Sequence, residues 1–148
     1  MAEPTLAGIH VTDLVASVLR ERPASDRPGD EPSPRRDRLQ SILDAIARQA
    51  ADPDLDPARL AEPLGLSVRY LHRVLEHTGR TFSQHVLQQR LMRAHRLLRD
   101  PRLAQSKISE LALSAGFTDL SHFNRSYRRH FEETPSTTRA NAALKENR

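Results

Sequence analysis

Cysteine is absent from the sequence, aromatic residues make up only 4%, and no apolar run approaches the roughly 20 residues of a membrane span. The absence of cysteine excludes disulfides, thiolate zinc sites and cysteine nucleophiles. The acidic N-terminal segment also lacks the basic region of a secretory signal. We therefore expect a cytoplasmic protein that does not contact a membrane.

Other marks of catalytic or metal sites are missing as well. No two of the seven histidines stand four positions apart, the spacing that would place a zinc-binding pair on one helix face. Ser83, Ser109 and Ser121 have neither a local base nor the glycine-rich elbow typical of a nucleophile. We expect no enzyme activity, no catalytic residue, no cofactor and no metal.

Positive charge is concentrated after residue 34. Residues 1–34 contain six acidic against three basic residues, whereas the rest of the chain contains 13 acidic against 20 basic residues. A basic excess of this kind suits a surface that binds nucleic acid phosphates. With 148 residues, the chain fits one domain of about 100 residues plus a tail, or two small lobes that share a long element.

The composition divides the chain into segments. Residues 1–20 have apolar residues at nearly helical spacing and are expected to form an amphipathic helix or to fray. Residues 21–34 are rich in proline, serine, glycine and charge, which predicts a flexible linker. Residues 35–140 form the expected folded domain, followed by a C-terminal tail at 141–148.

Helix signals recur through the expected domain. A first helix-turn-helix unit is expected at about residues 56–79, with Pro63 near the end of its opening helix. Residues 82–100 keep one helical period and predict a long linking helix, and a second unit is expected at about 106–131. Before them, Ser33 and Pro34 suit the start of a helix with an apolar face of Leu39, Ile42, Leu43, Ile46 and Ala47.

The two units repeat one pattern. Leu60–Ser67 and Leu111–Thr118 both read Leu-Ala-x-x-apolar-Gly-apolar-hydroxyl. If the second copy has one extra residue, Tyr70–Arg73 aligns with His122–Arg125, so that both second helices carry an arginine at equivalent places. A duplicated helix-turn-helix pattern is hard to obtain by chance. The sequence therefore predicts an all-α fold with two helix-turn-helix units joined by one long central helix.

The repeat carries a family resemblance. Residues 35–140 resemble the C-terminal DNA-binding region of AraC-type (AraC/XylS) transcription regulators. Three positions depart from the family pattern, namely Pro63, Glu132 in place of a glycine, and Thr138 in place of an aromatic residue. The motifs that carry the resemblance are Leu66–Arg73, Ile108–Ala112, Gly116–Arg125, Phe131, Thr134-Pro135 and Arg139.

The resemblance implies a sequence-specific DNA-binding transcription regulator that places two recognition helices in successive major-groove segments. A helical adaptor that binds a protein through an arginine-rich face is the alternative. The base-contacting candidates are Arg69, His72 and Arg73 in the first unit, and Leu120, Ser121, Asn124 and Arg125 in the second. The phosphate-contacting candidates are Arg90, Arg128, Arg129 and Arg139.

The expected partners follow from the same resemblance. Double-stranded DNA is the first, and RNA polymerase is the second if the protein is an activator. Residues 1–20 resemble the last helix of a sensor or dimerisation domain, and they are expected to be either a remnant of such a domain or a small dimer helix. We expect a monomer or a weak homodimer formed through this N-terminal helix.

Overall fold

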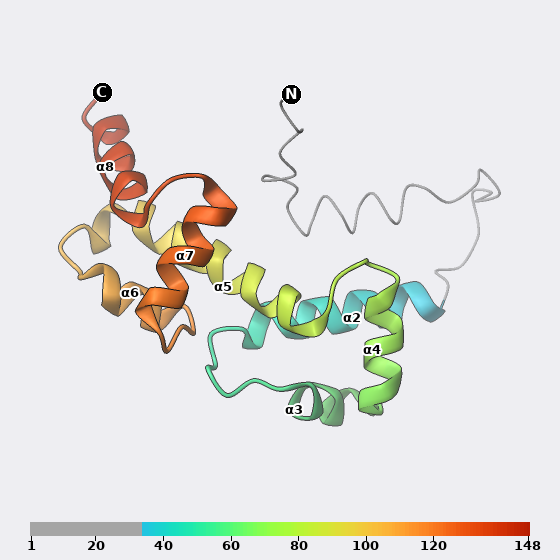
Figure 1. The fold of residues 1–148 in the computed structure, drawn as a ribbon. Coiled ribbons are helices and arrows are strands. Elements are labelled where there is room, and N and C mark those ends of the chain that lie inside the picture. Colours follow the sequence, from blue (N-terminus) through green and yellow to red (C-terminus); the bar gives the residue numbers. More distant parts are fainter. Residues whose placement is uncertain (1–33) are drawn as a thin grey trace, which may run out of the picture. The chain divides into compact units, whose positions relative to one another are not determined.

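The computed structural model describes residues 34–148 (Figure 1). The expected helix at 1–20 and nearly all of the expected linker at 21–34 lie outside the described residues. In the described part every regular element is a helix, which confirms the all-α fold, and no helix there is long and apolar enough to cross a membrane. This part forms two compact lobes, an N-terminal lobe of residues 34–49 and 54–86 and a C-terminal lobe of residues 50–53 and 87–148.

The N-terminal lobe packs three helices, α2 (Pro34–Gln49), α3 (Pro57–Ala61) and α4 (Val68–Glu76). The opening helix of the first unit ends earlier than expected, because Pro63 lies in a short 3-10 helix at Glu62–Leu64. Proline has no N–H to donate to the preceding turn of an α-helix. Ala47, which we expected on the apolar face of α2, is exposed. The buried core consists of Leu39, Ile42, Leu43, Ala45, Ile46, Leu60, Ala61, Leu71, Val74, Leu75, Phe82 and Val86.

A buried histidine, His85, forms a hydrogen bond with Thr78 in this lobe. The Nε2 atom of His85 lies 2.8 Å from Oγ1 of Thr78, whose hydroxyl donates to the carbonyl of Leu75 at 2.7 Å. Because the single hydroxyl hydrogen is used there, His85 must donate from Nε2. Its Nδ1 is then a buried lone pair without a hydrogen-bond partner among the described residues. Burial, and to a smaller extent the charge of Arg80, lowers the pKa of His85 to about 4.

We expect the free energy of unfolding to fall as the pH drops from 6.5 to about 4. In this range the unfolded chain binds a proton at His85 and the folded chain does not, so the contribution is complete above pH 6.5 and is lost toward pH 4. The shift corresponds to roughly 3 kcal/mol. Urea unfolding across this range would measure it. His85→Gln should flatten the profile and His77→Gln, at an exposed position, should not; equal profiles for the two variants would contradict the assignment.

The long linking helix is α5 (Phe82–Arg99), which begins in the N-terminal lobe and continues in the C-terminal lobe. Its start carries a capping box, since Thr81 N–H donates to Gln84 Oε1 at 2.8 Å and Gln84 N–H donates to Thr81 Oγ1 at 3.2 Å. A short 3-10 helix at Pro101–Leu103 follows.

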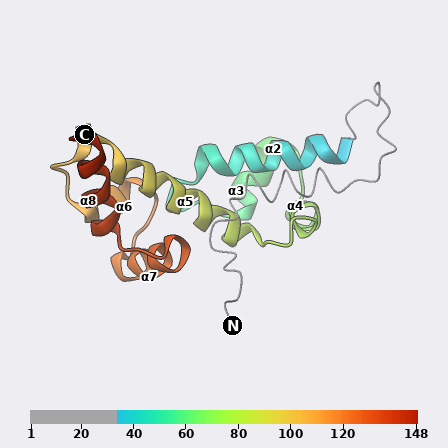
Figure 2. The same ribbon diagram turned by 90° about the horizontal axis from the view of Figure 1, so that it is seen from above.

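Three further helices gather around the C-terminal half of α5, namely α6 (Ile108–Ser114), α7 (Leu120–Phe131) and α8 (Pro135–Glu146) (Figures 1 and 2). Most of the segment that we expected to be a tail, residues 141–148, therefore belongs to α8. The core is aromatic where α7 enters it, and ring centroids lie 4.9 Å apart for Phe117 and Phe123 and 4.5 Å for Tyr127 and Phe131. Buried residues of this core are Leu91, Ala94, Leu98, Leu111, Ala112, Ala115, Phe117, Phe123 and Tyr127.

Candidate nucleic-acid interface

The turns of the two units have the same hydrogen bonds. In the first, Gly65 N–H donates to Glu62 O at 3.0 Å, and Leu66 N–H donates to Ala61 O at 3.0 Å. In the second, the corresponding bonds run from Gly116 to Leu113 at 3.0 Å and from Phe117 to Ala112 at 3.1 Å. This pair of bonds is the Schellman motif, in which a glycine with positive φ ends a helix. Gly65 and Gly116 have φ values of 67° and 106°.

Each turn leads into a capped second helix. The Ser67 side chain accepts from Tyr70 N–H at the start of α4, and the Asp119 side chain accepts from Ser121 and His122 N–H at the start of α7. Asp119 follows its glycine by three positions and Ser67 follows its glycine by two, so the extra residue of the second copy lies in the turn. Measured from these caps, Arg73 and Arg125 are each the sixth residue. The two arginines therefore occupy equivalent places on their helices.

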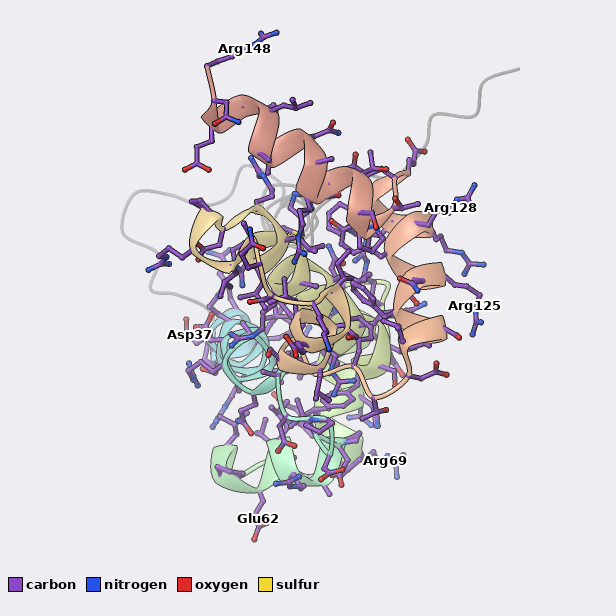
Figure 3. All side chains as sticks on the ribbon, turned by 90° about the vertical axis from the view of Figure 1, so that its left-hand side faces the viewer. Asp37, Glu62, Arg69, Arg125, Arg128 and Arg148 are labelled. Carbon is purple, nitrogen blue, oxygen red and sulfur yellow. The ribbon has the colours of Figure 1, made fainter. Side chains whose placement is uncertain are left out.

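The exposed face of α4 carries all three base-contacting candidates of the first unit. Leu71, Val74 and Leu75 are buried. Arg69, His72 and Arg73 are exposed, and Figure 3 shows Arg69 extending from the helix. The helix thus presents two guanidinium groups four positions apart, together with an imidazole.

The exposed face of α7 carries the four candidates of the second unit. Ser121, Asn124 and Arg125 are exposed, and Leu120 is 45% exposed, which excludes it from the core. Figure 3 shows Arg125 and Arg128 projecting from the same side of α7. The helix contains no acidic residue, so nothing on it offsets the charge of its three arginines.

A groove of about 600 Å³ runs beside α7 and past the first turns of α6 and α8. It brings Asn124, Arg125 and Arg128 together with hydroxyl groups that we did not predict from the sequence, those of Ser109 and Ser136. The only sequence signal for them is their position in the first turn of a helix, two residues after its N-cap. The full lining is Ile108, Ser109, Leu120, Asn124, Arg125, Arg128, Thr134, Pro135 and Ser136.

The four arginines expected to contact phosphates differ in their surroundings. Arg128 and Arg129 are exposed on α7. Arg90 is half-buried, and its Nε and Nη2 donate to Ala50 O and Asp52 O, both at 2.8 Å. Arg139 is half-buried, with Nε and Nη2 shielded from solvent. Arg90 is therefore engaged in holding the loop at 50–53, and exposure favours Arg128 and Arg129 as phosphate ligands.

Comparison with known proteins agrees with this geometry. Residues 60–141 match the family model described as a helix-turn-helix domain. The chain is 32% identical to the transcriptional activator RhrA of Rhizobium meliloti (strain 1021) over 134 residues, which are 90% of this chain and 41% of RhrA. It is 37% identical to the HTH-type transcriptional activator RhaS of Escherichia coli (strain SE11) over 103 residues, 69% of this chain and 36% of RhaS. The chain spans only about two fifths of the length of these relatives.

Solved structures carry the same two-unit fold. A transcriptional regulator from Chromobacterium violaceum, described as an AraC-type DNA-binding domain-containing protein, is 30% identical with a TM-score of 0.62, and the match covers 72% of this chain and 96% of that one. A DNA-binding transcriptional dual regulator from Escherichia coli K-12 has the same TM-score at 23% identity, covering 70% of this chain and 95% of that one. The chain belongs to the AraC-type helix-turn-helix family. The resemblance noted in the sequence is thereby confirmed.

Proposed function

We propose that this chain is the DNA-binding part of a transcription regulator that recognises a two-part duplex site, with α4 and α7 as its reading helices. The observation that carries the proposal is the duplicated unit, in which the same glycine turn, helix cap and exposed arginine occur twice. A basic surface used for general attraction would not require Arg73 and Arg125 to hold equivalent places.

The reading helices offer the chemistry of base recognition. Arg73 and Arg125 suit bidentate contact with O6 and N7 of guanine. Asn124 suits adenine, and Leu120 suits the methyl group of thymine. Arg69, His72 and Ser121 are further base-contacting candidates, while Arg128 and Arg129 suit phosphates, which fix the position of the protein without reading sequence.

The linking helix suits a two-part site. At a rise of 1.5 Å, the 18 residues of α5 are about 27 Å long. One turn of duplex DNA is about 34 Å, so the length of α5 is comparable with the separation of successive major-groove segments. If the spacing that the protein imposes falls short of one straight turn, the DNA must bend toward the protein.

The wider role is proposed from the relatives. RhrA and RhaS are named transcriptional activators, which supports a regulatory role and makes RNA polymerase a partner if this chain also activates. We propose no enzyme activity for it, and we propose that it acts in the cytoplasm as a monomer or weak homodimer. The alternative, a helical adaptor, accounts for the arginine-rich surface but not for the repeated turn.

Binding should depend steeply on salt. If about six phosphates are neutralised, the logarithm of the association constant should fall against the logarithm of salt concentration with a slope near −5, because each contact releases condensed counterions. Fluorescence anisotropy with a labelled duplex at several salt concentrations measures the slope. Arg128→Ala should make it shallower by about one. A response that does not change with salt would count against DNA as the partner.

A further inference from the structure

A chain of hydrogen bonds outside the proposed DNA contacts joins three helices of the C-terminal lobe. The hydroxyl of Tyr127 on α7 donates to Thr138 Oγ1 on α8 at 2.8 Å. Thr138 Oγ1 donates to Glu133 Oε1, in the turn between these helices, at 2.6 Å. His95 Nδ1 on α5 lies 2.8 Å from the Tyr127 hydroxyl. We call these four residues the relay.

The donor and the acceptor of every hydrogen bond in the relay can be assigned by starting from the carboxylate of Glu133. An ionised Glu133 only accepts, so Thr138 must donate its single hydrogen to it. Thr138 can then only accept from Tyr127, and Tyr127 can only accept from His95, which must carry its hydrogen on Nδ1. Each hydroxyl is used once as a donor and once as an acceptor. Removal of one member therefore leaves a buried polar group without its partner.

The relay adds directional hydrogen bonds to the aromatic packing around Tyr127. Tyr127 is fully buried, and its ring contacts Phe123 and Phe131 at centroid distances of 5.5 and 4.5 Å. Ring contacts of this kind tolerate sliding and rotation, whereas a hydrogen bond to a fixed acceptor is directional. The exposed surface of the same helix carries Asn124 and Arg125. A rotation of α7 about its axis would move both side chains relative to a base.

The carboxylate of Glu133 also accepts hydrogen bonds just after the end of α7. Glu132 ends the helix at φ 59°, a left-handed conformation that is disfavoured for residues with a Cβ. The next residue, Glu133, accepts from Thr138 and from Asn141 Nδ2 at 3.4 Å. Glu133 thus ties the end of α7 to α8 at the point where the chain reverses.

We propose that Thr138 and Glu133 are positioning residues for base recognition, acting through Tyr127 to fix the rotational setting of α7. Side chains that read bases must be held within about half an ångström, so a small rotation suffices to lose discrimination. The inference rests on the proposed function, because it requires α7 to read sequence. Neither residue touches DNA in this account.

Two matched pairs of variants test the proposal. Thr138→Val keeps the volume and removes the hydroxyl, while Thr138→Ser keeps the hydroxyl. Glu133→Ala, at a half-buried turn position, removes the acceptor, while Glu133→Gln keeps an acceptor oxygen. Competition binding measures the preference for the correct base. One set of duplexes has a base pair changed in the half-site assigned to α7, and the other set has one changed in the half-site assigned to α4. All proteins are measured at a temperature where circular dichroism shows full folding.

Thr138→Val and Glu133→Ala should lose about tenfold in preference for the correct base in the α7 half-site. They should keep their preference in the α4 half-site, and Thr138→Ser and Glu133→Gln should retain both preferences. Unchanged preference in a folded Thr138→Val or Glu133→Ala, or equal loss in both half-sites, would overturn the positioning role while leaving the proposed function intact. A wild-type protein without preference in either half-site would overturn both.

Discussion

Replacing Gly116 with alanine is expected to destabilise the C-terminal lobe by about 3–5 kcal/mol, the range of severe core and backbone defects. At φ 106° an added Cβ would lie 2.6 Å from Ala50 O and 2.8 Å from Arg90 Nε. These two atoms form a hydrogen bond with each other at 2.8 Å, so the new methyl group would force them apart. The variant combines a disfavoured backbone conformation with the loss of a half-buried charged hydrogen bond.

Gly65 is the matched control for this substitution. It ends the corresponding turn of the first unit at φ 67°, but an added Cβ there would meet no atom within 4 Å. Gly65→Ala should therefore cost only the conformational term, about 1 kcal/mol. Urea unfolding followed by circular dichroism measures both variants. Equal losses would show that the contact of Gly116 with the loop at 50–53 does not contribute to stability.

Arg73→Ala and Arg125→Ala should each weaken binding to the preferred duplex by about 1–3 kcal/mol, because a bidentate contact with guanine is lost. Arg125→Lys keeps the charge but not the planar fork, and should lose most of the same preference. Arg129→Ala removes an equal charge from the same helix and should weaken preferred and unrelated duplexes alike. Titrations of each variant against a preferred and an unrelated duplex give the comparison. A uniform loss in all four variants would favour a nonspecific basic surface.

Much of the two helix-turn-helix units was predictable from the sequence, because their features depend on neighbouring residues. A glycine turn, a helix cap and an amphipathic second helix each depend on a few neighbouring residues, and here they occur twice. The equivalence of Arg73 and Arg125 followed from aligning the two copies, and both helices start at a side-chain cap, Ser67 and Asp119. Their contacts with bases stay a prediction, as does the division of the chain into segments around residues 35–140.

Interactions between residues distant in sequence were not predictable in this way. Arg90 binds backbone carbonyls 38 and 40 positions away, which no pattern around Arg90 indicates. The relay likewise joins His95 to a tyrosine 32 positions later. Tyr127 stands four positions after Phe123 and four before Phe131, which is the spacing of ordinary core residues on a helix. Thr138 was noticed only as a departure from the family pattern. Pro63 shows a different limit, since a single missing N–H changed an expected α-helical turn into a 3-10 turn.

Selection of bound sequences from a random duplex library distinguishes recognition of a two-part site from general attraction to DNA. The wild-type protein should enrich a motif with two conserved parts separated by about one helical turn. Arg73→Ala should relax one part and Arg125→Ala the other, while Arg129→Ala should leave the motif unchanged. Enrichment of no motif, or loss of the same positions in the Arg73 and Arg125 variants, would contradict recognition of DNA by two equivalent reading helices.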